Sequence, residues 1–418
     1  MKIVTPAYYK DFKCIAGDCT DTCCAGWDVD VDDASYKKYL GCLKDAADGG
    51  FAACSDSQNG RFAGYSVEDE KMAVSVRERL SRVMVPEEEG GCTFALTEAK
   101  RCPFLNDANL CDLYTAYGEK ALCDTCTEFP RFINEYGGTR EIGLAPSCIT
   151  AGELMLSRKE PFAMTESNDS SIFPSENDID PELFLALKSL RARLLKLIAD
   201  REVSIPKRLL ACMDEVLKFE REYWEEENSS DQEASGSLNR LDMSGEAITD
   251  RGRKWNSFDV VTKYLLPFPG MEVINPDWNK LLKVHQLFIE DMFFPQDVEK
   301  VTREFDEAYK GRETEYEQLL SYYIYRYILD AVYDENVILK LKIMLVGWIC
   351  VRRLDLAVFY DKKNLSFADQ VDICHLYSRQ FEHSYENFEW YTSQFEDANI
   401  YSLENLRAIL EAEAALCD

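Results

Sequence analysis

The sequence lacks a long apolar run, and this bears on whether the chain meets a membrane. A bilayer-spanning helix needs about 18 or more consecutive apolar residues, whereas the longest candidate, residues 338–351, is interrupted by Lys340 and Lys342. Residues 1–14 likewise contain no apolar run of the length found in a secretory signal. We therefore expect a soluble cytoplasmic protein that has no membrane partner.

Positive charge is also scarce. Asp and Glu number 76 against 47 Lys and Arg, which gives a formal net charge of −29. Proteins that bind a phosphate backbone need clustered Lys and Arg side chains, so nucleic acid is excluded as a partner. The acidity either maintains solubility or attracts a basic partner surface, and both interpretations stay open.

Histidines and nucleotide-binding motifs are few or absent. The three histidines, His285, His375 and His383, have no spacing typical of a metal site or a catalytic triad. Neither G-x-G-x-x-G nor G-x-x-x-x-G-K-[ST] occurs, so the sequence supports neither a standard dinucleotide-binding fold nor a P-loop.

Cysteine is abundant, but only in one part of the chain. Of sixteen cysteines, twelve lie in the first 148 residues. Disulfides rarely persist in a reducing compartment, so metal binding or redox chemistry is the better explanation there.

The cysteines form two groups with ligand-like spacing, C-x4-C-x3-C-C and a later group that contains a C-x2-C pair. The candidate metal ligands are Cys14, Cys19, Cys23, Cys24, Cys102, Cys111, Cys123, Cys126 and Cys148. Four thiolates suit zinc or an iron–sulfur cluster. Irregular spacing with a single tight pair favours the cluster, and zinc is the alternative metal. The competing interpretation is that these cysteines are small buried hydrophobes.

Composition divides the chain and predicts a mainly α fold. Residues 1–164 form a cysteine-rich domain stabilised partly by metal, residues 165–181 are a polar linker with two prolines, and residues 182–418 form a mostly helical domain. Apolar residues at helical spacing predict helices over 182–200, from 207 onward, 278–289, 298–308, 313–333, 336–356, 366–381 and 403–416.

The cysteine segments resemble those of a known family, the flagellin lysine-N-methylases. This family shares a cysteine-rich, iron- or zinc-chelating domain named for its CxxCxxCC pattern. The resemblance rests on the segments YYKDFKCIAGDCTDTCCAGWD, RCPFLNDANLCDLY, ALCDTCTEFPRF and APSCIT. The family pattern often has proline after the last motif cysteine, whereas Ile149 follows Cys148 here.

The resemblance implies an S-adenosylmethionine-dependent protein-lysine N-methyltransferase that acts on flagellin and holds an iron–sulfur cluster, of the 4Fe-4S type, at the nine cysteines. The alternatives are a non-catalytic zinc- or iron-chelating protein and a redox protein that uses the cluster. The long helical region favours the enzyme, because a chelator would not need it. The sequence identifies no catalytic base, no donor pocket and no oligomeric state.

One aromatic segment bears on the methyl donor. A sulfonium cation is attracted to aromatic faces, and Tyr322, Tyr323, Tyr325 and Tyr327 lie within one predicted helix. Such a stripe more often packs in a core, which is the interpretation we favour.

Overall fold

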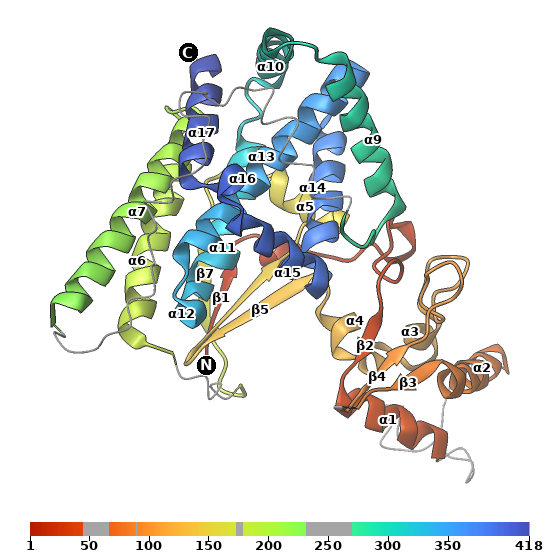
Figure 1. The fold of residues 1–418 in the computed structure, drawn as a ribbon. Helices are drawn as coiled ribbons and strands as arrows, with labels where there is room; N and C mark the ends of the chain where they lie inside the picture. The colour runs from red at the N-terminus through yellow and green to blue at the C-terminus, as the bar shows by residue number, and fades with distance from the viewer. Residues whose placement is uncertain (45–66, 89, 173–178, 231–269, 418) are drawn as a thin grey trace. The chain divides into compact units, whose positions relative to one another are not determined.

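The computed structural model describes residues 1–44, 67–88, 90–172, 179–230 and 270–417. The chain divides into two compact units, of which the larger comprises Met1–Phe12 with Ile133–Asp418 and the smaller comprises Lys13–Phe132. The smaller unit is therefore inserted into the chain of the larger. Helices predominate in the described residues (Figure 1), and this confirms the predicted mainly α fold class.

The inserted unit and the domain drawn from composition have different limits. Composition placed one domain over residues 1–164, whereas the inserted unit covers Lys13–Phe132. Eight of the nine candidate ligands fall inside the inserted unit, and Cys148 belongs to the larger one.

Most of the larger unit is helical. Its longer helices are α6 (Pro181–Ile198), α7 (Ile205–Ser230), α9 (Pro276–Asp291), α10 (Pro295–Tyr309), α11 (Thr314–Tyr327), α13 (Val337–Lys362), α14 (Phe367–Glu382) and α17 (Leu403–Cys417). Its shorter helices are α5 (Ile149–Leu156), α12 (Ala331–Asp334), α15 (Tyr385–Ser393) and α16 (Ala398–Tyr401). The predicted windows thus correspond to the longer helices.

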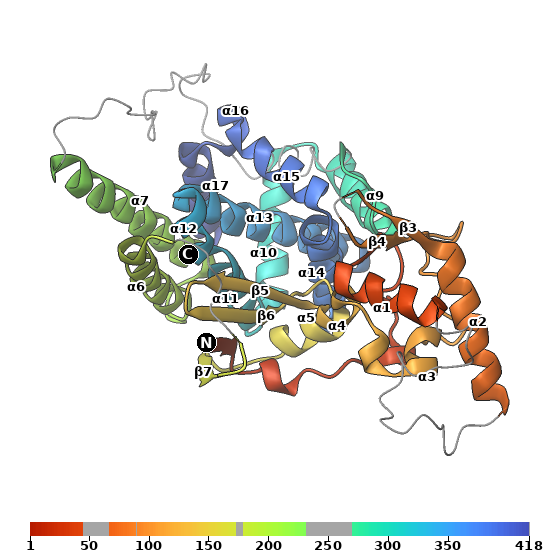
Figure 2. The same cartoon turned by 90° about the horizontal axis from the view of Figure 1, so that it is seen from below.

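Helix α6 shows why these windows were recognisable. The side chain of Asp180 accepts a hydrogen bond from the Glu182 N–H at 2.8 Å, and Pro181 begins the helix. Both features are typical of a helix N-terminus. The leucine stripe that begins at Leu183 is buried, and α6 lies beside α7 in both views (Figures 1 and 2).

Two helices end elsewhere than the periodicity indicated. The window over 313–333 is divided, because α11 is followed by the 3-10 turn Ile328–Asp330 before α12. The carboxylate of Asp330 accepts the Tyr136 hydroxyl at 2.6 Å, a tertiary contact that local sequence does not reveal. Helix α13 runs on to Lys362 and is buried on nearly every side, so its end has no amphipathic signature.

A small four-stranded sheet was not predicted, and all of it except the first two residues of β5 belongs to the larger unit. Its strands are β1 (Lys2–Pro6), β5 (Arg131–Tyr136), β6 (Thr139–Leu144) and β7 (Met164–Asn168), in the order β5-β6-β1-β7. Strand β1 pairs in parallel with β6 and antiparallel with β7. All five residues of β7 are exposed, so part of the expected linker over 165–181 is a polar edge strand.

Buried polar contacts hold helices against this sheet. Arg191 of α6 donates to the Glu141 carboxylate of β6, with Nη2 at 2.7 Å from Oε1, and both side chains are almost fully buried. The Tyr325 hydroxyl of α11 donates to the Val4 carbonyl of β1 at 2.9 Å.

The inserted unit combines short helices with a three-stranded sheet. Its elements are β2 (Val29–Val31), α1 (Asp33–Lys44), α2 (Val67–Val83), β3 (Met84–Pro86), β4 (Cys92–Phe94), α3 (Asp112–Tyr117) and α4 (Asp124–Glu128). The strand order is β2-β4-β3. Across both units, no helix in the described part of the chain has the length and apolarity needed to cross a bilayer.

Candidate functional site

Five of the nine candidate ligands share one buried region of the inserted unit. Cys102 and Cys123 belong to its hydrophobic core, and Cys24, Cys111 and Cys126 pack against that core. We call these five cysteines the thiol core. The structure thus brings the end of the first cysteine group together with most of the second.

Backbone contacts hold the segments of the thiol core in register. The Cys102 N–H donates to the Cys24 carbonyl at 2.8 Å, and Cys111 forms a β-bridge with Leu105. Cys123 precedes α4, and the Cys126 N–H donates back to the Cys123 carbonyl at 3.1 Å. The C-x2-C pair therefore presents both thiols from a single turn, as its spacing predicted.

The thiols of this region influence one another. Burial raises the pKa of Cys102 to about 12 and also raises that of Cys111, and repulsion from neighbouring thiolates acts in the same direction. The hydrogen bond between Cys123 and Cys126 lowers the pKa of Cys123 and raises that of Cys126. Ionising several of these thiols together therefore requires a compensating positive charge, which a bound metal supplies.

The other four candidate ligands have different surroundings. Cys14 is exposed, and its sulfur accepts the Ala16 N–H at 3.4 Å. Cys19 and Cys23 are partly buried, and the Cys19 thiol donates to the Asp21 carbonyl at 3.2 Å. Cys148 is the N-cap residue of α5 in the larger unit.

The thiol core suits a metal in its chemistry but not in its present side-chain positions. Buried sulfur donors are typical ligands of zinc and of iron–sulfur clusters. In the described ranges, however, no three or more His, Cys, Asp or Glu side chains converge as ligands of one ion. The assignment of the nine cysteines as ligands therefore stays a prediction.

A second candidate site is a cavity of about 640 Å³ in the larger unit. Its walls come from the α6–α7 connection, the start of α7, the helices α10, α11 and α13, and the end of α17. Its volume lies in the range of about 300–1,000 Å³ that is usual for small-molecule sites. We call it the helical cavity.

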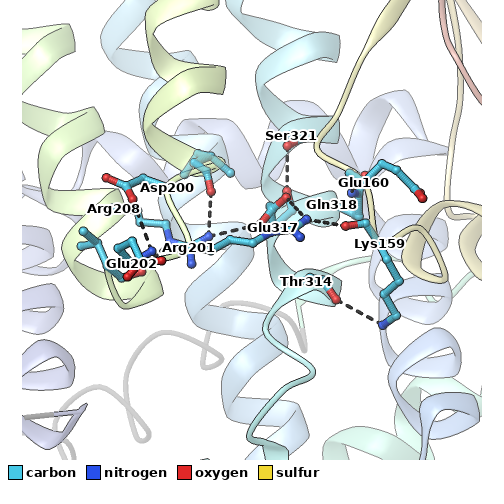
Figure 3. Close-up of polar contacts among 12 residues, drawn as sticks. Lys159, Glu160, Asp200, Arg201, Glu202, Arg208, Thr314, Glu317, Gln318 and Ser321 are labelled. Carbon is cyan, nitrogen blue, oxygen red and sulfur yellow. Dashed lines mark hydrogen bonds and ion pairs between the residues drawn. The ribbon is translucent and has the colours of Figure 1, made fainter.

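Glu317 organises one wall of the helical cavity. Its buried carboxylate accepts two hydrogen bonds from Arg201, from Nε and Nη2, both at 2.8 Å, and a third from Arg208 Nη1 at 3.3 Å (Figure 3). Arg201 Nη2 also donates to the Lys159 carbonyl at 2.6 Å. A bidentate arginine pair fixes direction as well as charge, so this wall is rigid and polar.

Another part of the cavity wall is aromatic. The rings of Tyr309 and Tyr316 lie 5.0 Å apart, and the Tyr316 ring meets Trp348 edge-on at 6.1 Å. The Tyr316 hydroxyl donates to the Asp355 carboxylate at 2.5 Å, and burial raises the pKa of Asp355 to about 7. The indole Nε1 of Trp348 is buried and has no acceptor among the described residues.

The tyrosine stripe lies in the core, as we favoured from the sequence. All four of its tyrosines are buried. The hydroxyls of Tyr322 and Tyr327 donate to the Glu382 carboxylate at 2.9 and 2.5 Å.

Sequence reasoning missed the helical cavity altogether. Its lining comes from separate segments between Arg201 and Cys417, and each segment resembles an ordinary charged helix end. Local spacing carries no signal for such an assembly.

His383 gives a prediction about acid stability. Its ring is hydrogen-bonded to the Ser147 hydroxyl, and burial, with Arg326 and Arg379 nearby, lowers its pKa to about 3. In the unfolded chain this histidine has a pKa of about 6.5 and gains a proton as the pH falls below that value, whereas in the folded protein it stays neutral. The free energy of unfolding should therefore fall by about 2 kcal/mol between pH 7 and pH 5 because of this group. Urea unfolding of the protein and of His383→Gln at both pH values measures the effect. An equally steep loss in the variant would contradict this assignment.

Comparisons with known proteins point in one direction. The family described as FliB lysine N-methylase C-terminal domain matches residues 191–409. A lysine-N-methylase of Salmonella choleraesuis is 24% identical over 184 residues, or 42% of this chain and 40% of that protein. The lysine-N-methylase of Salmonella typhimurium is 22% identical over the same length, with the same coverage. The flagellar biosynthetic protein FliU of Salmonella muenchen is 23% identical over 169 residues, or 40% of this chain and 85% of that protein.

The relatives match only part of this chain, at 40–42% of its length. The chain spans about two fifths of the length of the lysine-N-methylases that it matches. No solved structure matches the chain. Within the helical cavity, all lining residues except Leu416 and Cys417 fall inside the matched range.

Proposed function

The chain belongs to the FliB lysine N-methylase family, and from this premise we propose that it is a protein-lysine N-methyltransferase that uses S-adenosylmethionine. The match over residues 191–409 carries the proposal, because it includes most of the helical unit. The names of the two lysine-N-methylases support the same reaction.

The proposed reaction exchanges one bond for another. The sulfur–methyl bond of the donor breaks, a nitrogen–methyl bond forms on lysine, and the lysine nitrogen loses a proton. Bound S-adenosylmethionine supplies the methyl group from a sulfonium cation. Since an ammonium has no lone pair, a group on the protein or the solvent must accept that proton.

A suitable proton acceptor is bonded to a residue that lines the helical cavity. Asp355 has a pKa of about 7, close to the value at which a general base is most effective at neutral pH. Asp355 does not itself line the cavity, but its carboxylate accepts the hydroxyl of Tyr316, a residue that does. We propose that the Tyr316–Asp355 pair takes up the lysine proton.

We propose flagellin as the protein substrate. The name of the Salmonella muenchen relative, a flagellar biosynthetic protein, supports this choice, and so does the resemblance of the cysteine segments. A chain with a net charge of −29 also attracts a surface that presents lysines.

We further propose that the thiol core, with the remaining candidate cysteines, holds an iron–sulfur cluster. Its support is the gathering of five sulfur donors, two buried and three partly buried, at one hydrophobic core. Thiolate ligation requires side-chain movement that brings the donors together, and binding of the metal would then stabilise the inserted unit.

The proposed activity predicts methylated lysines and a rate that depends on salt and pH. Reconstituted protein, flagellin and S-adenosylmethionine should give lysine peptides whose masses have increased by whole methyl groups. Charge attraction is screened over about 10 Å at 0.1 M salt, so kcat/KM should fall on the order of tenfold from low to physiological salt. It should rise as the pH passes through about 7, where Asp355 ionises.

The control is kcat at saturating flagellin, which should change little with salt because association no longer limits the rate. No mass change with a fully loaded cluster and several flagellins would favour the chelating-protein alternative. Reversible one-electron reduction of the cluster without methylation would favour the redox protein.

A further inference from the structure

We infer that the helical cavity is the binding site of the methyl donor, S-adenosylmethionine, and that Trp348 and Arg201 contact it directly. This inference rests on the proposed function, since it assigns a place to the donor of that reaction. The cavity is large enough, at about 640 Å³, for a ligand made of a nucleoside and an amino acid.

The aromatic wall suits the nucleoside and sulfonium parts of the donor. Tyr309, Tyr316 and Trp348 line this part of the cavity and pack against one another, and aromatic side chains of this kind bind adenine and attract a sulfonium. Trp348 is only 1% exposed, and its Nε1 donor has no acceptor among the described residues. Buried donors normally have partners, so this N–H is suited to a ring nitrogen or ribose oxygen of a ligand.

The polar wall suits the amino-acid part. Arg201 uses Nε and Nη2 for Glu317 and Lys159, whereas its Nη1 donates to no described residue. Its side chain is 41% exposed, while the Glu317 side chain behind it is 1% exposed. The guanidinium is therefore held in place and keeps donors available for a ligand carboxylate.

Acceptors for the ligand ammonium lie on neighbouring parts of the wall. Asp306 lines the cavity and its carboxylate is 26% exposed beside Arg352. Glu313 also lines the cavity and is exposed. The donor's carboxylate and ammonium thus both find groups of opposite charge.

The balance of charge argues against a phosphorylated ligand. Five basic and five acidic side chains line the cavity: Arg201, Arg208, Arg303, Lys310 and Arg352, against Glu202, Asp306, Glu307, Glu313 and Glu317. A polyphosphate site needs a clear excess of positive charge or a row of backbone N–H groups. A ligand with charges of both signs fits the balanced lining better.

The test measures binding of S-adenosylmethionine and S-adenosylhomocysteine to the full-length reconstituted protein by calorimetry. Trp348→Phe keeps an aromatic side chain but removes the indole N–H, and it should weaken binding about three- to tenfold. Arg201→Gln should weaken it about tenfold or more, because a charged hydrogen bond is lost. Melting temperatures show whether each variant is folded. If Arg201→Gln does not fold, the test rests on Trp348→Phe alone.

The chain offers matched controls for both changes. Trp278→Phe alters another tryptophan of the larger unit that is 1% exposed and does not line the cavity. Arg193→Gln alters an arginine of similar exposure, 44%, which pairs with Glu215 and also lies outside the cavity. Both controls should bind the donor within about twofold of the unchanged protein.

The outcomes separate this inference from the proposed function. Donor binding and methylation that are unchanged in Trp348→Phe and Arg201→Gln would overturn the cavity assignment and leave the methyltransferase intact. Absence of both donor binding and methylation in the unchanged protein would overturn both. Weaker binding in the two variants alone supports the assignment.

Discussion

Replacing Glu413 by alanine should lower the free energy of unfolding by about 3–5 kcal/mol, because it removes the shared partner of two buried arginines. Glu413 of α17 accepts Arg352 Nε at 2.7 Å and also pairs with Arg353. Attraction to the two guanidinium groups outweighs the effect of burial and holds the pKa of Glu413 at about 2. Without this carboxylate, Arg353 would keep no described carboxylate partner.

Urea unfolding followed by circular dichroism measures the effect, with Glu411→Ala as the control. Glu411 is exposed on the same helix, so its loss should change stability by no more than about 0.5 kcal/mol. The contribution of Glu413 should persist down to about pH 4.5, the value at which the unfolded carboxyl titrates, and disappear as the pH falls toward 2. Equal stability of the two variants at pH 7 would contradict the prediction.

Replacing Cys123 and Cys126 together by serine should abolish the iron and acid-labile sulfide of the anaerobically purified protein. Both thiols come from one turn at α4, and Cys123 is fully buried in the core of the inserted unit. Serine is a poor ligand for iron–sulfur clusters, which are held by thiolates. Because binding energy of a structural metal is also folding energy, the inserted unit should become much more sensitive to proteolysis.

The matched control removes two thiols elsewhere. Cys350→Ala with Cys374→Ala changes two fully buried cysteines of the larger unit, and it should leave iron and sulfide per folded molecule unchanged. The proposal fails if the serine variant retains its full iron and sulfide. It also fails if the unchanged protein holds one equivalent of zinc without sulfide, a result that would favour the alternative metal.

The helices were predictable because their signal is local. Leu187, Leu190 and Leu194 of α6 recur at helical spacing, and all three are completely buried. The strands were not predictable for the opposite reason. Lys2 pairs with Thr139 on one side and with Asn168 on the other, and such pairings are set by partners far along the chain.

The same distinction applies to the candidate sites. The C-x2-C pair was visible because Cys123 and Cys126 lie within one helical turn, and the proximity of Cys24 to Cys102 followed only from the fold. Glu317 looked like an ordinary helix charge, and its burial between Arg201 and Arg208 depends on the packing of α6 and the α6–α7 connection against α11. Neither the burial of a charge nor the walls of a cavity can be read from local spacing.

Strand β1 has a consequence for the order of events during synthesis. It is made before the inserted unit, whereas its neighbours β6 and β7 are made only after the whole of that unit. A chain emerges at about 5–20 residues per second and domains fold as units, so β1 must wait several seconds with unpaired N–H and C=O groups. The inserted unit can meanwhile fold, whereas the sheet of the larger unit closes only when the chain returns at Thr139.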